Sequence, residues 1–400
     1  MRAVPRLSAA YPSIRARVRE EIEDFQVEEV LAYEAAGEGT HSFLLVEKKG
    51  LTTFEAVRRL SRALGRRDRD FGYAGLKDKH ARTRQWISIE HLEEGRLEGL
   101  DLPGMEILEL RKHRNKIKLG HLRGNRFVLR LRGVGEGDEA RARDILSLLE
   151  RRGLPNAFGL QRFGRGSATP RLGTLLLEER WEDFLRVWAG SSVGLGEAEV
   201  EGLGPDELLT HCEGKDRFVF QALDRWKKRD AKAAVRSCQR RFLSLCTAAL
   251  QSQVFNRVLA ARLETLDRIQ EGEVAMLHRN GAVFAVEDPS TEQPRCDAFE
   301  ISPTGPLPGP LCPEAQGPTG ALEAEILAAS HISPELFQSK GPYAQRGSRR
   351  SLRVPLRDAS VHTLPGKDSE QDLELSFFLP SGSYATRVFF ELLGSEAGDP

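Results

Sequence analysis

The alternation of hydrophobic and polar residues over the first third of the chain predicts short strands interrupted by helices. Segments of β-favouring or alternating residues predict strands at 14–19, 25–31, 42–47, 85–89 and 126–132, with the first three pairing antiparallel. In the last segment, Phe127, Leu129 and Leu131 alternate with arginines. That alternation predicts a half-buried strand with one basic face.

A helix is predicted immediately after Thr52. The sequence Thr-Thr-Phe-Glu at 52–55 has the spacing of a capping box, in which the first Thr and the Glu satisfy each other's backbone N–H groups. Val57, Leu60 and Leu64 then follow at helical spacing, and Gly65 is a stop signal. These features predict one amphipathic helix that ends at Gly65.

From about residue 156 the pattern becomes helical. Helices are predicted at 169–179, 181–188, 230–244 and 247–264. The stretch 302–313 holds so much Pro and Gly that neither a helix nor a central strand is expected there. A strand at 373–379 and a closing helix at 383–393 follow. This order indicates a helical segment inserted into a split, β-rich domain.

Length and composition exclude several classes of protein. A chain of 400 residues with 40% hydrophobic residues predicts two or three folded domains. Its 59 Lys+Arg balance 59 Asp+Glu, so the overall charge indicates no partner. The five cysteines form no C-x-x-C pair, so no metal site or disulfide framework is expected. No signal segment or long apolar run is found, which predicts a cytoplasmic protein with no membrane association.

Local clusters of positive charge are more informative than the total. Residues 111–132 hold nine Lys+Arg and no acidic residue, and residues 225–241 hold eight against one Asp. A third cluster comprises the arginines between 346 and 353. A single cluster is typical of a solvated face. Three of them in a neutral chain favour a phosphate-binding surface.

One acidic residue stands out in a basic loop. Asp78 lies between Lys77 and Lys79 in a glycine-bearing segment after a short apolar strand, and its carboxylate is expected to stay ionised. A lone Asp in a loop is usually a turn residue or a helix cap. The pattern alone therefore favours a structural role over catalysis.

The segment GLKDKHARTRQW at 75–86 resembles the catalytic signature of the TruD family of tRNA pseudouridine synthases. Four further segments resemble family motifs in the same order: EDFQVEE at 23–29, GNRF at 124–127, NAFGLQRFG at 156–164 and LPSGSYAT at 379–386. The resemblance therefore extends over the whole chain.

The resemblance implies an α+β fold. Residues 1–155 and 303–400 would form a split pseudouridine-synthase catalytic domain with a mixed, mostly antiparallel sheet. Residues 156–302 would form an inserted α/β TRUD domain that faces it across a cleft. RNA would lie in that cleft, with the 111–132 strip on one wall and the 225–241 cluster a candidate for the other.

The resemblance also implies roles for individual residues. Asp78 matches the family nucleophile, and Arg19 stands where a basic residue, usually Lys, contacts it. Because Arg is planar and forked, the ion pair is expected but with altered geometry. Residues matching the family's substrate contacts are Phe25, Asn125, Phe127 and Tyr384, the last in place of a common Phe. Candidates for contacts with the RNA backbone are Lys77, Lys79, Arg111, Lys112, Arg114, Lys116, Lys118 and Arg162.

The implied activity is the isomerisation of uridine to pseudouridine, at position 13 of tRNA. The reaction breaks a C–N glycosidic bond, rotates the base and forms a C–C bond to the same ribose, so no cofactor and no metal are expected. The base must leave its stack, which suits an aromatic pocket. The carboxylate could form a covalent adduct or take a proton on the way through a glycal intermediate, and the sequence leaves both routes open. The expected partner is tRNA, and a monomer is expected.

Other functions fit the sequence less well. The run of glycines from Gly133 to Gly137 imitates a dinucleotide-binding fingerprint, but the third required glycine is Asp138. A glycoside hydrolase built on Asp78 would not need the flanking lysines and basic clusters. A non-catalytic RNA-binding module of the same fold is the alternative that remains.

Overall fold

The computed structural model describes residues 4–330, 332–338 and 343–395. The chain divides into two compact units, and each is described by itself. We call Ser8–Leu154 with Val354–Pro400 the sheet unit, and Met1–Leu7 with Pro155–Arg353 the helical unit. Strands β8 (Leu154–Pro155) and β13 (Arg353–Val354) lie at the two crossings of the chain.

The helical unit extends further along the chain than the predicted insertion at 156–302. It continues to Arg353 because β11 (Ile301–Leu307) pairs antiparallel with both β9 (Val274–Leu277) and β12 (Ser348–Ser351). These strands carry residues 303–353 with the helical unit. Whether the two units correspond to a catalytic and an inserted domain stays a prediction.

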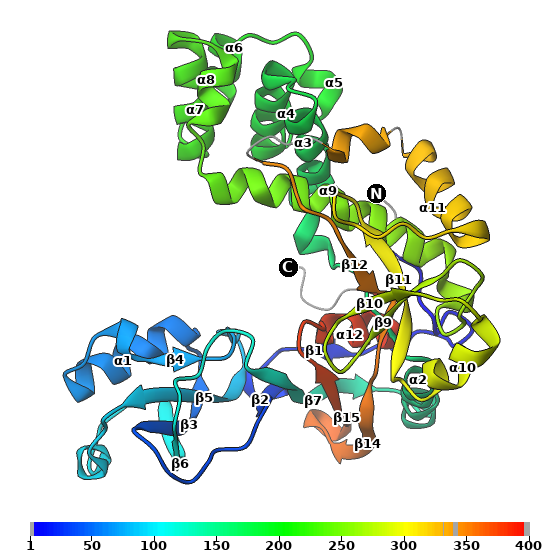
Figure 1. Cartoon of the computed structure of the whole chain (residues 1–400). Helices are drawn as coiled ribbons and strands as arrows, with labels where there is room; N and C mark the ends of the chain where they lie inside the picture. Colours follow the sequence, from blue (N-terminus) through cyan, green and yellow to red (C-terminus); the bar gives the residue numbers. More distant parts are fainter. Residues whose placement is uncertain (1–3, 331, 339–342, 396–400) are drawn as a thin grey trace. The chain divides into compact units, whose positions relative to one another are not determined.

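The sheet unit is built on one nine-stranded sheet. Its strands are β1 (Arg17–Val18), β2 (Phe25–Leu31), β3 (His41–Lys49), β4 (Gly72–Tyr73), β5 (Arg82–Glu90), β6 (Met105–His113), β7 (Leu122–Val134), β14 (Arg357–Pro365) and β15 (Gln371–Pro380). Their order is β14-β15-β7-β2-β5-β3-β6, with β1 pairing β7 and β4 pairing β5. Figure 1 shows β15, from the red end of the chain, beside β7, as the register requires.

The predicted mixed, mostly antiparallel sheet is confirmed, but one part of the pairing prediction is wrong. The first three predicted strands do not pair with one another, because β7 and β5 lie on either side of β2. The β2–β5 pair is parallel, whereas β3 pairs antiparallel with β5 and β6. Strands distant in the sequence therefore separate those that are near.

Among the described residues, three helices belong to the sheet unit: α1 (Thr53–Leu64), α2 (Asp138–Arg152) and α12 (Ala385–Leu393). The predicted start and stop of α1 are confirmed. Thr52 is the N-cap, Glu55 completes the capping box, and Gly65 ends the helix in the left-handed conformation. Val57, Leu60 and Leu64 are buried against the sheet's core. Local chemistry alone is enough to define this helix.

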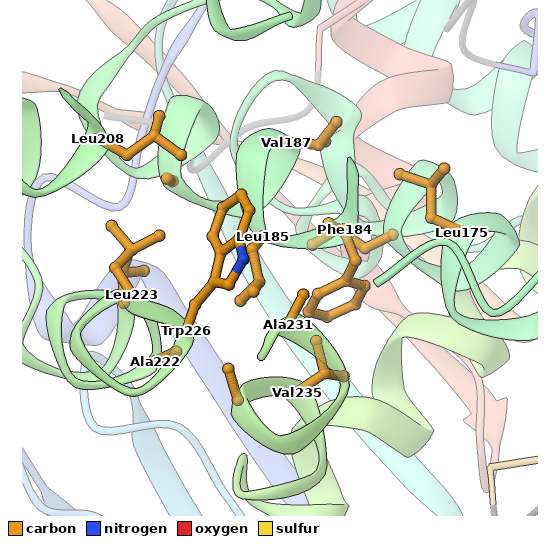
Figure 2. Close-up of a cluster of buried hydrophobic side chains, with 14 of the residues drawn as sticks. Leu175, Phe184, Leu185, Val187, Leu208, Ala222, Leu223, Trp226, Ala231 and Val235 are labelled. Atoms are coloured by element: carbon orange, nitrogen blue, oxygen red, sulfur yellow. The ribbon is translucent and has the colours of Figure 1, made fainter. Parts of the chain in front are cut away.

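The helical unit contains nine helices in the described chain: α3 (Ala168–Leu177), α4 (Trp181–Val193), α5 (Glu197–Val200), α6 (Pro205–Cys212), α7 (Arg217–Lys228), α8 (Ala231–Arg236), α9 (Arg240–Ala261), α10 (Pro289–Asp297) and α11 (Gly317–Ala329). Side chains from α3, α4 and α6–α8 gather in one apolar cluster (Figure 2). A strand β10 (Val283–Ala285) completes a small sheet in the order β10-β9-β11-β12.

The predicted break between the helices at 230–244 and 247–264 is misplaced. The chain leaves the helix at Ser237, whose hydroxyl donates to the Ala234 carbonyl at 2.7 Å and competes with the next helical bond. From Arg240 the helix α9 runs without interruption, because Leu243, Cys246 and Leu250 continue one buried face.

The prediction that residues 302–313 cannot form a central strand is wrong for its first half. Ile301–Pro303 pair with β9, and Thr304–Leu307 pair with β12. Pro303 contributes its carbonyl, which accepts the Leu352 N–H at 2.9 Å. The prolines of this segment thus lie within a paired strand.

Within the described residues, none of the helices is both long enough and apolar enough to cross a membrane.

Candidate active site

Asp78 lies in the sheet unit, on the loop that joins β4 to β5, and its side chain is exposed. Hydrogen bonds from neighbouring elements fix the loop just before it. The Lys77 N–H donates to Thr53 Oγ1 at 2.9 Å, and Gln85 Nε2 donates to the Gly75 carbonyl at 2.6 Å. Thr53 and Gln85 are themselves joined at 2.9 Å. An exposed carboxylate is thus presented by a rigid backbone.

Lys48, at the end of β3, also holds this loop, and the sequence analysis missed it. Its side chain is almost fully buried, and Nζ donates to the Asp78 carbonyl at 3.1 Å and to the Leu51 carbonyl. Burial lowers the pKa of the Lys48 ammonium to about 8, although the negative charge of Asp78 opposes the shift. The ammonium therefore anchors the backbone of Asp78 and adds positive charge beside its carboxylate.

Lys77 has a structural role here. Its Nζ lies 2.9 Å from Glu29 Oε1, and both side chains are buried. The other carboxylate oxygen of Glu29 accepts the Trp86 N–H at 3.0 Å. The Lys77 ammonium, predicted to contact the RNA backbone, instead forms a buried ion pair with Glu29. This pair links the Asp78 loop to β2 and, through the Trp86 N–H, to β5.

Arg19 follows β1 with a φ of 57°, a left-handed conformation that costs a non-glycine residue about 1–2 kcal/mol. Its guanidinium carbon lies 4.2 Å from the centroid of the Phe25 ring. Burial lowers the pKa of Arg19, and the charge of Asp78 acts in the opposite direction. In the described chain no direct ion pair joins the two residues, and Arg19 Nε is a buried atom without a hydrogen-bond partner. Arg19 therefore lies near Asp78, and its Nε–H group forms no hydrogen bond within the described chain.

Two of the predicted substrate-contacting aromatics are buried. Phe25 and Phe127 pack edge to face, with ring centroids 6.1 Å apart, and Phe127 stacks on Phe377 at 5.6 Å. These rings form part of the core beside Arg19. Their faces are occupied by protein, so their contact with a base stays a prediction.

Further buried polar atoms without partners lie in β7 and in the segment between β15 and α12. Asn125 of β7 lies opposite Glu29 of β2 and Leu379 of β15, and its Oδ1 is buried with no hydrogen bond in the described chain. The hydroxyl of Ser383 is in the same state. Tyr384, next along the chain, is 47% exposed. Buried polar atoms normally find a partner, so these atoms indicate a place for a polar ligand.

The strip at 111–132 is less positive in the structure than in the sequence. Arg111, Lys112 and Arg114 are paired with Glu109, Glu94 and Glu38, respectively. Lys116 Nζ donates to the Arg69 carbonyl at 2.6 Å. Lys118 forms no ion pair with any described residue. Acidic residues from other segments therefore balance much of the strip.

The remaining backbone candidates belong to other segments of the chain. Lys79, beside Asp78, is exposed and 3.6 Å from Glu55. Arg162 belongs to the helical unit, where its Nε donates to Ser252 at 3.3 Å and its guanidinium lies 5.7 Å from the centroid of Phe158. The described residues contain no cluster of three His, Cys, Asp or Glu side chains placed to hold a metal ion.

Comparison with known proteins covers nearly the whole chain. The family model of tRNA pseudouridine synthase D (TruD) matches residues 6–392. The chain is 42% identical to the tRNA pseudouridine synthase D of Geobacter metallireducens, over 97% of each chain. It is 39% identical to that of Thermus thermophilus, over 99% of this chain and 93% of the relative.

Among solved structures, the fold matches that of a putative tRNA pseudouridine synthase D (TruD) from Methanosarcina mazei. The TM-score is 0.87 at 24% sequence identity, and the match covers 98% of this chain and 96% of the other. The predicted α+β class is confirmed by this match.

Proposed function

The chain belongs to the tRNA pseudouridine synthase D (TruD) family, and from this premise we propose that it isomerises uridine to pseudouridine in tRNA, at position 13, with Asp78 as the nucleophile. The observation that carries the proposal is the Asp78 loop itself. An exposed carboxylate stands on a backbone held by Lys48 and Thr53, with the positive charges of Lys48 and Arg19 close by. Position 13 rests on the family resemblance.

The chemistry needs few groups from the protein. The C–N glycosidic bond breaks, the base rotates, and its C5 bonds to C1′ of the same ribose while the C5 proton is released. Asp78 can attack to form a covalent adduct that is later resolved, or take a proton on a route through a glycal. On either route the positive charges of Arg19 and Lys48 act on the Asp78 carboxylate.

The base must leave its stack to reach Asp78, and the partnerless polar atoms support a site for it. Asn125 Oδ1 can accept a hydrogen bond from the base edge, and Arg19 Nε can donate one. Tyr384 offers an exposed ring for stacking. A cytoplasmic location and a monomeric state stay predictions.

The test is mass-spectrometric mapping of pseudouridine in a tRNA transcript treated with wild-type or Asp78→Asn protein. Wild-type protein is expected to form pseudouridine at position 13 with EDTA present and no added cofactor. Asn lacks a carboxylate that can attack or take a proton, so turnover should fall by roughly a thousandfold or more. An Asp78→Asn protein that keeps its activity would remove the nucleophile. An inactive wild-type protein that still binds tRNA would favour a non-catalytic RNA-binding module.

A further inference from the structure

The helical unit contains a cavity of about 1050 Å³ that borders α4, α7 and the segment joining α8 to α9. Its lining includes three aromatic and three basic side chains, Trp188, Phe218, Phe242, Arg225, Lys228 and Arg229, together with the acids Asp216 and Asp224. All of them belong to one unit, so the cavity does not depend on how the two units are placed. No residue of the Asp78 site takes part in it.

Helix α7 borders both the cavity and the core of the helical unit. Its apolar residues Val219, Ala222, Leu223 and Trp226 are buried, and Leu223 and Trp226 lie in the cluster of Figure 2. The residues of α7 that line the cavity are Phe218, Gln221, Arg225 and Lys228 on a second helical stripe, together with the buried Ala222 and the acidic Asp224. A helix with one face in the core and a separate basic, aromatic face is built to present that second face to a ligand.

The charges around the cavity favour an anion. Asp216 is used as the N-cap of α7, where it accepts the Phe218 N–H at 2.8 Å, and Asp224 pairs with Lys228 at 2.8 Å. Arg225 and Arg229 are exposed, and neither forms an ion pair with any described residue. Both acids of the lining are thus engaged while two guanidinium groups remain available. Guanidinium is well suited to phosphate because of its forked donors.

The aromatic residues favour a base as the second element of the ligand. Trp188 and Phe242 stack with centroids 4.7 Å apart, and Phe218 is 53% exposed. An exposed Phe ring beside arginines and the amide of Gln221 resembles the surfaces on which unpaired bases stack. The cavity therefore combines the three kinds of group that bind a nucleotide.

We propose that this cavity binds a tRNA segment, with Arg225 and Arg229 contacting phosphates and an unpaired base stacked on Phe218. Three more exposed arginines, Arg236, Arg240 and Arg241, lie beyond the cavity lining and pair with no acidic residue in the described chain. This continuation of positive charge fits a polymer better than a free mononucleotide. The choice of tRNA rests on the proposed function, whereas the nucleic-acid chemistry rests on the cavity alone.

The test is filter binding of a tRNA transcript over a series of salt concentrations, using the full-length protein. For Arg225→Gln/Arg229→Gln we expect the Kd to rise roughly tenfold and the salt slope to fall by about 0.7 for each lost phosphate contact. Phe218→Leu should raise the Kd roughly fivefold with the slope unchanged, because only stacking is lost. Thermal melting of each variant checks that the helices remain folded.

The matched control is Arg180→Gln/Lys232→Gln, which removes two exposed charges of the same unit that are already paired with acidic residues. Arg225→Lys/Arg229→Lys should retain most of the binding. Pocket variants that bind tRNA like the control would overturn the inference, as would full competition by uridine monophosphate at concentrations near the tRNA Kd. Product formation is scored on wild-type protein alone. Its absence would count against the proposed function and leave the binding result intact.

Discussion

Positive charges are held in opposite ways near Asp78 and around the α7 cavity. Near Asp78 in the sheet unit, Lys48 and Lys77 are buried and bound to carbonyl or carboxylate oxygens. In the helical unit, Arg225 and Arg229 are exposed and have no acidic partner in the described chain. A buried charge must be compensated and is therefore fixed in place. An exposed, uncompensated charge attracts phosphate over a distance and in a salt-dependent way.

The difference indicates that the two regions have different functions. Fixed charges suit a reaction in which a carboxylate must keep its orientation, so changes near Asp78 should alter rate or stability. Free charges suit the capture of RNA, so changes in the helical unit should alter affinity and its salt dependence. Each prediction below tests either the fixed charges near Asp78, through rate or stability, or the exposed arginines, through tRNA affinity.

After Asp78→Asn, the largest effect is expected at Arg19, which combines features of both regions because it is half buried yet has a free donor. Arg19→Ala should lower turnover at saturating tRNA by roughly a hundredfold, since the charge that orients Asp78 is lost. Single-turnover kinetics measures the effect. Arg19→Lys, which restores the usual family residue, should recover most of the rate.

Combining Arg19→Ala with Asp78→Asn tests whether the two residues act on one step. We expect the double variant to be about as slow as Asp78→Asn alone, because Arg19 has nothing left to orient. Additive losses would show that Arg19 contributes independently of Asp78. Unchanged turnover in Arg19→Ala would remove it from the site.

Some of this organisation follows from the sequence because its causes are local. The capping box at Thr52 and the glycine at 65 define both ends of α1 within one short segment. The alternation around Phe127 likewise predicts β7, whose arginines and apolar residues must lie on opposite faces. In both cases neighbouring residues alone determine the element.

Other features could not be predicted, because residues distant in the sequence create them. Lys48 stands beyond the predicted strand at 42–47, and its burial depends on carbonyls at Leu51 and Asp78. The strand β11 forms, despite its prolines, by pairing with β9 and β12, which are distant in the sequence. The left-handed Arg19 has no signal of its own, since that conformation is typical of glycine.

A smaller effect, on stability, is expected from Lys48→Met. The pKa of Lys48 falls to about 8 in the folded protein from 10.5, so below pH 8 the charged form opposes folding by roughly 3 kcal/mol. Between pH 8 and 10.5 the unfolded chain binds the extra proton, so wild-type stability should rise with pH relative to the variant. Urea unfolding of both proteins at pH 7.5 and pH 10 measures this difference. A gap that does not change with pH would mean that Lys48 is well solvated.

The smallest effect is expected from the strip at 111–132. It allows paired arginines to be compared with the unpaired Arg225 and Arg229. Arg111 and Arg114 are exposed and paired with Glu109 and Glu38, so a phosphate must displace a carboxylate from each. Such surface ion pairs contribute at most about 1 kcal/mol of stability. tRNA can therefore still bind both arginines, but each contact contributes less binding free energy. Arg111→Gln/Arg114→Gln should therefore raise the tRNA Kd by less than Arg225→Gln/Arg229→Gln, with a smaller change in salt slope. The same filter-binding series compares the two double variants at equal loss of charge. If the strip variant were the weaker binder, acidic partners would not decide which arginines capture RNA, and the contrast between the two units would fail.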